Sequence, residues 1–133
     1  MIDIKDLRIG NIVLGENNEL IEVETIHYDG VNYMDGHIYG TNFNDLKPIK
    51  LTPEILKQVG FEKTKDFDDD DLYDFEESNY RKLTLIKLRG YDAFRVMDVD
   101  NRIDIKFLHD LQNTFYIFNN KQELPIDINT LKI

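Results

Sequence analysis

Residues 50–63, KLTPEILKQVGFEK, carry signals for both the start and the end of a short helix. Thr52 is of the type that accepts hydrogen bonds from the amides of a first helical turn, and Pro53 has the φ angle that the first helical position needs. Gly60 suits the left-handed residue that follows a helix. The sequence therefore predicts a short helix near residues 53–59, and the rest of the chain must fold around it.

Short strands are expected on both sides of this helix. Residues 20–28 alternate apolar and polar side chains with a period near two, which is typical of a half-buried strand. The Asp29-Gly30 pair that follows is a strong signal for a hairpin. Residues 34–45 contain several turn formers and are interpreted as a loop or a short edge strand. Residues 80–105 are rich in β-branched and apolar side chains and predict two or three further strands.

The apolar spacing changes to that of a helix near residues 106–118. Five apolar side chains fall within an arc of about 100° at 3.6 residues per turn: Phe107, Leu108, Leu111, Phe115 and Phe118. Together these patterns predict an α+β fold, with a bent antiparallel sheet of short strands in two groups, a short helix and a longer C-terminal helix. The N-terminal strands are compatible with an SH3-like arrangement.

A polar stripe runs beside the apolar one on the predicted C-terminal helix. His109, Gln112, Asn113 and Tyr116 stand at i, i+3, i+4 and i+7, so their side chains share one face. Such residues usually satisfy nearby backbone groups, which favours hydrogen bonding to a loop or strand edge inside the fold. The alternative is an interaction stripe that faces a partner.

The length and composition indicate one domain, residues 1–133, that folds without disulfides or metals. The chain has no cysteine, which agrees with a reducing compartment. Neither a signal-peptide segment nor an apolar run long enough to cross a bilayer is present. A soluble cytoplasmic protein without membrane contact is expected, and the sequence carries no signal for its oligomeric state.

The net charge of −10 comes mostly from one stretch. Residues 66–77 hold eight carboxylates and no basic residue, and without them the net charge would be −2. A patch of this kind repels phosphate backbones, and no basic stripe elsewhere compensates for it, so direct nucleic-acid binding is not expected. The stretch is predicted to be an acidic, mobile loop over about residues 65–79.

A calcium loop over residues 66–77 is the alternative interpretation of this stretch. Its ligands would be Asp66, Asp68, Asp70, Asp74 and Glu77, with the backbone carbonyl of Leu72. However, Asp71 stands where the sharp turn of such a loop needs glycine. The flanking segments also lack the two helices of an EF-hand. No metal or cofactor is therefore predicted, and these five side chains remain weak metal-ligand candidates.

Three segments resemble the recurring segments of a group of small uncharacterised proteins found in bacteriophages and integrated mobile elements. They are LRIGNIVL, DLKPIKLTPEILKQVGFEK and IKFLHDLQNTFYIFNNKQEL, and their order and spacing match over most of the chain. In the segment HDLQNT, residues 109–114, Asp110 and Thr114 depart from the pattern of the group. Asn119-Asn120 replaces its usual Thr-Gly pair, and asparagine can adopt the same left-handed turn. The resemblance implies an accessory protein of phage or mobile-element origin and brings no activity.

No catalytic constellation is found in the sequence. Ser78 is the sole serine and no GxSxG motif frames it, while His27, His37 and His109 have no metal-ligand spacing. A non-enzymatic accessory protein that binds another protein is therefore the expected function. An acidic decoy that mimics nucleic acid and occupies a basic protein is the alternative.

Overall fold

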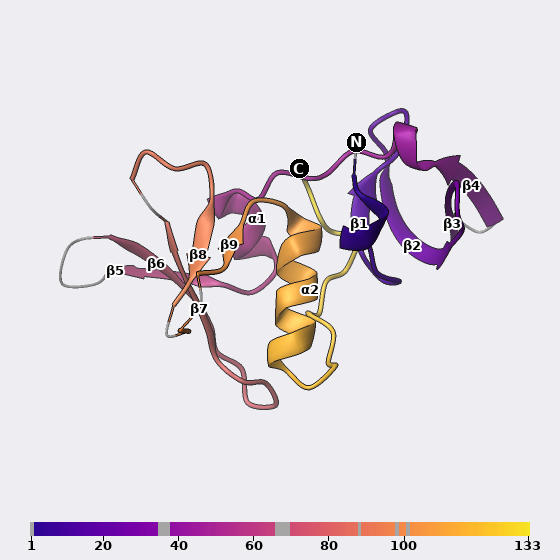
Figure 1. Ribbon diagram of the computed structural model, residues 1–133. Helices are drawn as coiled ribbons and strands as arrows, with labels where there is room; N and C mark the ends of the chain where they lie inside the picture. Colours follow the sequence, from indigo (N-terminus) through magenta and orange to yellow (C-terminus); the bar gives the residue numbers. More distant parts are fainter. Residues whose placement is uncertain (1, 35–37, 66–69, 88, 98, 101) are drawn as a thin grey trace. The chain divides into compact units, whose positions relative to one another are not determined.

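The computed structural model describes the whole chain except residues 1, 35–37, 66–69, 88, 98 and 101. The chain divides into two compact units, each described here by itself. Unit 1 is Met1–Lys50 with Phe107–Asn113, and unit 2 is Leu51–Lys106 with Thr114–Ile133. The predicted α+β fold is confirmed, and the two predicted groups of strands form two separate antiparallel sheets (Figure 1). The expected single domain stays a prediction.

Unit 1 contains a four-stranded sheet with the order β1-β2-β3-β4. The strands are β1 (Ile12–Leu14), β2 (Leu20–Ile26), β3 (Gly30–Met34) and β4 (Ile38–Asn42). Two short 3-10 turns, Ile4–Asp6 and Phe43–Asp45, flank them. The alternation of β2 buries Ile21 and Val23 against Val13 of β1 and Val31 of β3, which forms the core of this unit.

The predicted hairpin joins β2 and β3. The N–H of His27 donates to the carbonyl of Gly30 over 2.8 Å, so Gly30 begins the second strand and the turn lies just before it. The register shifts between Val23 and Thr25, which marks a bulge in β2. Of the two interpretations of residues 34–45, the short edge strand is confirmed by β4.

In unit 2 the predicted short helix is α1 (Pro53–Gln58). Its start has the expected cap, because the Thr52 hydroxyl oxygen accepts the Ile55 N–H over 3.2 Å. Gly60 has a φ of 106°, and the N–H of Phe61 donates to the carbonyl of Leu56 over 2.9 Å. This is the Schellman geometry that a glycine after a helix makes accessible.

Unit 2 also contains a five-stranded sheet with the order β5-β6-β7-β8-β9. The strands are β5 (Glu62–Lys65), β6 (Asp71–Phe75), β7 (Leu83–Lys87), β8 (Phe94–Val96) and β9 (Asp104–Ile105). Buried aromatic rings form its core. Phe75 makes edge-to-face contact with Phe115 at a centroid distance of 5.0 Å, and Tyr73 does so with Phe94 at 5.6 Å.

The prediction of an acidic loop over residues 65–79 is wrong for its centre. Asp71–Phe75 form β6, which pairs antiparallel with β5 and with β7. The strand forms because Tyr73 and Phe75 point into the core, while Leu72 and Asp74, at the alternate positions, are half-buried. The acidic stretch is therefore partly one arm of a hairpin.

The second helix, α2 (Leu108–Phe118), begins two residues later than predicted and ends as predicted. Leu108–Asn113 belongs to unit 1 and Thr114–Phe118 to unit 2. Asn120 adopts a φ of 53°, and the N–H of Lys121 donates to the carbonyl of Tyr116 over 2.8 Å. The prediction that asparagine takes the left-handed turn here is confirmed.

Candidate functional site

Gln112 belongs to the polar stripe of α2 and is buried in unit 1. Its Oε1 accepts the N–H of Ile12 over 2.8 Å, and its Nε2 donates to the carbonyl of Gly10 over 3.0 Å. One side-chain amide thus satisfies a donor and an acceptor at the outer edge of β1. Gln112 has a structural role inside unit 1.

Asn113 extends the same network. Its Oδ1 accepts hydrogen bonds from Asn11 Nδ2 over 2.8 Å and from Arg8 Nε over 3.2 Å, and its Nδ2 donates to the carbonyl of Asp6 over 2.8 Å. Asn11 is completely buried, and its own Oδ1 accepts the Arg8 N–H over 2.7 Å. Of the two predicted uses of the stripe, hydrogen bonding inside the fold is the one observed at Gln112 and Asn113.

His109 is also buried in unit 1, with 3% of its surface exposed. Its ring stacks on Phe107 at a centroid distance of 5.8 Å, and its Nε2 lies 3.5 Å from Asp110 Oδ1. Its Nδ1 has no hydrogen-bond partner among the described residues. Burial lowers the pKa of His109 below its usual value, although the carboxylates of Asp110 and Asp6 oppose this shift. Tyr116, the last member of the stripe, is half-buried.

The calcium interpretation does not agree with the observed backbone. A calcium loop wraps around one ion at 2.3 to 2.6 Å, whereas a strand over Asp71–Phe75 extends for about 13 Å. Asp74 accepts a hydrogen bond from the Thr84 hydroxyl over 2.6 Å. Asp66 and Asp68 lie outside the described residues. Among those that are described, no three His, Asp or Glu side chains are grouped to hold a metal ion.

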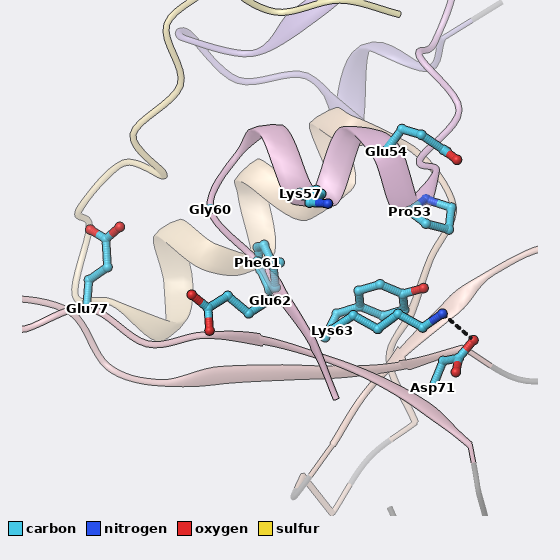
Figure 2. A pocket seen from close by; sticks show the side chains of 10 residues that line it. Pro53, Glu54, Lys57, Gly60, Phe61, Glu62, Lys63, Asp71 and Glu77 are labelled. Atoms are coloured by element: carbon cyan, nitrogen blue, oxygen red, sulfur yellow. Dashed lines mark ion pairs between the residues drawn. The ribbon is translucent and has the colours of Figure 1, made fainter. Parts of the chain in front are cut away.

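Unit 2 contains a groove whose lining residues are all described. It has a volume of about 980 Å³ and lies between α1 and the β5–β6 hairpin (Figure 2). Two aromatic residues, Phe61 and Tyr73, line it and are almost completely buried. The C-terminal end of α1 borders one end of the groove, because the turn at Gly60 reverses the chain into β5. The groove therefore combines an apolar floor with walls from a helix and a strand.

Charged side chains form the rim of this groove. They are four carboxylates and two ammonium groups, from Glu54, Glu62, Asp71, Glu77, Lys57 and Lys63. Lys63 Nζ lies 3.5 Å from Asp71 Oδ2, and Figure 2 shows this ion pair as a dashed line. Outside that ion pair, the lining residues carry three carboxylates and one ammonium group, that of Lys57. The groove has a net negative charge.

Tyr73 is the buried titratable side chain among the residues that line the groove. Burial raises the pKa of Tyr73, and although Lys63 opposes the shift, Asp71 and Glu54 add to it. The phenol is therefore neutral at physiological pH and is no general base. The lining residues include no histidine, serine or cysteine that could form a nucleophile and base pair.

Strand β5 borders the groove and is the first strand of its sheet. It pairs with β6 only, all four of its residues are exposed, and no described residue forms a hydrogen bond with its outer edge. The edge of β1 in unit 1 differs. There Gln112 binds Ile12, while Leu14 and Lys47 exchange two hydrogen bonds of 2.9 Å.

The sequence patterns did not predict this groove. Thr52, Pro53 and Gly60 were interpreted as helix signals alone, and the acidic composition around Tyr73 concealed a strand. A usable signal was present, because Phe61, Tyr73 and Phe75 are large aromatic residues that a solvated loop would leave exposed.

Comparisons with models of protein families, with curated proteins and with solved structures found no match for this chain. Within the residues that the structure describes, none of the helices is both long and apolar enough to span a membrane.

Proposed function

We propose that the protein is a non-enzymatic binding protein, and that a protein partner occupies the groove between α1 and β5. The observation that carries this proposal is the buried aromatic floor of Phe61 and Tyr73 beneath a charged rim. Apolar pockets with a few polar groups at their margin are typical of binding sites. The lack of a nucleophile and base pair among the lining residues supports binding over catalysis.

The resemblance of three segments to proteins of bacteriophages and mobile elements supports an accessory role in such an element. The cytoplasm of the host cell is the corresponding location. The decoy alternative has weaker support, because a decoy must present its carboxylates freely along a surface. Asp71 is instead paired with Lys63, and Asp74 accepts a hydrogen bond from Thr84.

Site-specific photocrosslinking tests the proposal. A benzoylphenylalanine replaces the exposed Lys57 at the groove rim, and a control chain carries it at the exposed Glu24 of unit 1. In host-cell extract, we expect a protein adduct of defined mass from position 57 and none from position 24. Adducts from neither position, or equally from both, would refute the assignment of the groove. A third chain carries the benzoylphenylalanine at Asp70, and an adduct from this position with none from position 57 would support the decoy.

A further inference from the structure

We infer that the partner presents an extended, positively charged segment, which joins the sheet of unit 2 as a strand beside β5. This inference rests on the proposed function, because it names the kind of partner that the groove takes. An acidic segment in place of a cationic one is an outcome of the test below.

The first argument is the open edge of β5. A strand that pairs on one side leaves alternate N–H and C=O groups directed away from its sheet, where another extended chain can bind them. Glu62–Lys65 pairs with β6 only, and no described residue bonds to its other side. Four residues give an edge of about 10 Å, which matches the short segments that bind by strand addition.

The second argument is the position of the groove. Glu62 and Lys63 of β5 line the groove together with Phe61 and with Tyr73, which lies opposite Lys63 on β6. Every second side chain of an added strand faces the same side of the sheet. Apolar side chains at alternate positions of the partner would therefore lie on the groove side of the sheet, while the remaining positions face away from it.

The third argument is charge. Glu54, Glu62 and Glu77 form no ion pair with any described residue, whereas Lys63 is paired with Asp71. Lysine or arginine side chains in the partner would be attracted to this rim, and an acidic segment would be repelled. The occupant that fits both the backbone and the charge is an extended cationic segment.

Fluorescence anisotropy with short labelled peptides tests this inference on the full chain. The probe is an acetylated heptapeptide of alternating lysine and valine. One control peptide has glutamate in place of lysine, and another is N-methylated at its central amides, which removes the donors that strand addition uses. We expect saturable binding of the probe and a loss of at least about tenfold in affinity for each control.

Two triple variants locate the binding. The groove variant neutralises three rim carboxylates: Glu54→Gln, Glu62→Gln and Glu77→Gln. A matched variant with the same change in net charge neutralises three exposed carboxylates of unit 1: Glu16→Gln, Glu24→Gln and Asp29→Asn. We expect the groove variant to bind the probe at least about tenfold more weakly and the matched variant to bind it unchanged. Equal losses would mean unspecific attraction and would overturn the inference.

The inference also fails if the N-methylated peptide binds as well as the probe, or if no saturable binding is found up to about 1 mM peptide. These failures are distinguishable from failure of the proposed function. A protein adduct from Lys57 that persists when the probe does not bind would leave the groove as the binding site and exclude strand addition. If position 57 gives no protein adduct and the peptide probe does not bind, both proposals are refuted.

Discussion

The side chain of Gln112 stands beside Ile12 in the place that a neighbouring strand would occupy. It accepts the N–H of Ile12 over 2.8 Å and donates to the carbonyl of Gly10 over 3.0 Å, which is the pair of bonds that a strand backbone supplies. Both Ile12 and Gln112 are buried, so water does not substitute readily for either bond.

Replacing Gln112 by leucine should destabilise the protein by about 2 to 4 kcal/mol, because it leaves the Ile12 N–H and the Gly10 carbonyl unpaired. Urea unfolding followed by circular dichroism measures this loss. Gln122→Leu is the control, since Gln122 is exposed. A loss at position 112 no larger than that at position 122 would contradict the assigned role.

Replacing Asn113 by alanine should cost about 1 to 3 kcal/mol, because the buried Asn11 amide then loses its acceptor. The same unfolding measurement applies, with the exposed Asn129→Ala as the matched change. If the two variants were equally stable, the network around Asn113 would contribute nothing and this part of the stripe would be open to a partner.

The free energy of unfolding should decrease as the pH drops below about 6.5, the usual pKa of histidine. Burial places the pKa of His109 below that value in the folded chain, so the unfolded chain binds more protons in the interval between the two. The stability that the neutral ring confers is therefore complete above the unfolded pKa and is lost as the pH falls toward the folded pKa. Urea unfolding at pH 7.5 and pH 5.5 measures the loss.

His109→Phe should reduce this loss between the two pH values, because phenylalanine carries no proton and can still stack on Phe107. His27→Gln, at an exposed histidine of the same unit, is the matched variant for comparison. An identical pH dependence in the His109→Phe variant would show that protonation of His109 is not its source.

Gly60→Ala should destabilise the protein by about 1 to 3 kcal/mol. At a φ of 106° any side chain is strained, and an added Cβ would lie 3.0 Å from Cε2 of Phe75. Gly90→Ala is the matched control, because Gly90 has a φ of 77° and no atom within 4 Å of an added Cβ. Thermal melting should show the larger decrease for Gly60, and the reverse order would exclude the contact with Phe75 as a cause.

The start and end of α1 and the end of α2 could be predicted from the sequence because their signals are local. Thr52 caps α1 through an amide three residues away, and Gly60 and Asn120 adopt their left-handed conformations within the turns that they end. Such features depend on the type of residue at a position and little on distant parts of the chain.

The β5–β6 hairpin and the groove could not be predicted in this way. Tyr73 and Phe75 are held by Phe94 and Phe115, which lie far along the chain. Composition alone therefore described the acidic stretch around them as a solvated loop. The sequence could place Gln112 and Asn113 on one face of a helix, but which backbone groups they bind depends on how unit 1 folds around β1.

Unit 1 is completed by residues that are synthesised late. Residues 1–50 emerge first, but their partner segment, Phe107–Asn113, follows only after residues 51–106. At about 5 to 20 residues per second, translation of the intervening stretch takes roughly 3 to 11 seconds. Throughout this interval the nascent strand β1 lacks the amide of Gln112 and presents an open edge next to Asn11. A ribosome stalled in this region would therefore hold the four strands of unit 1 without the segment Phe107–Asn113, a form exposed to aggregation and to capture by chaperones.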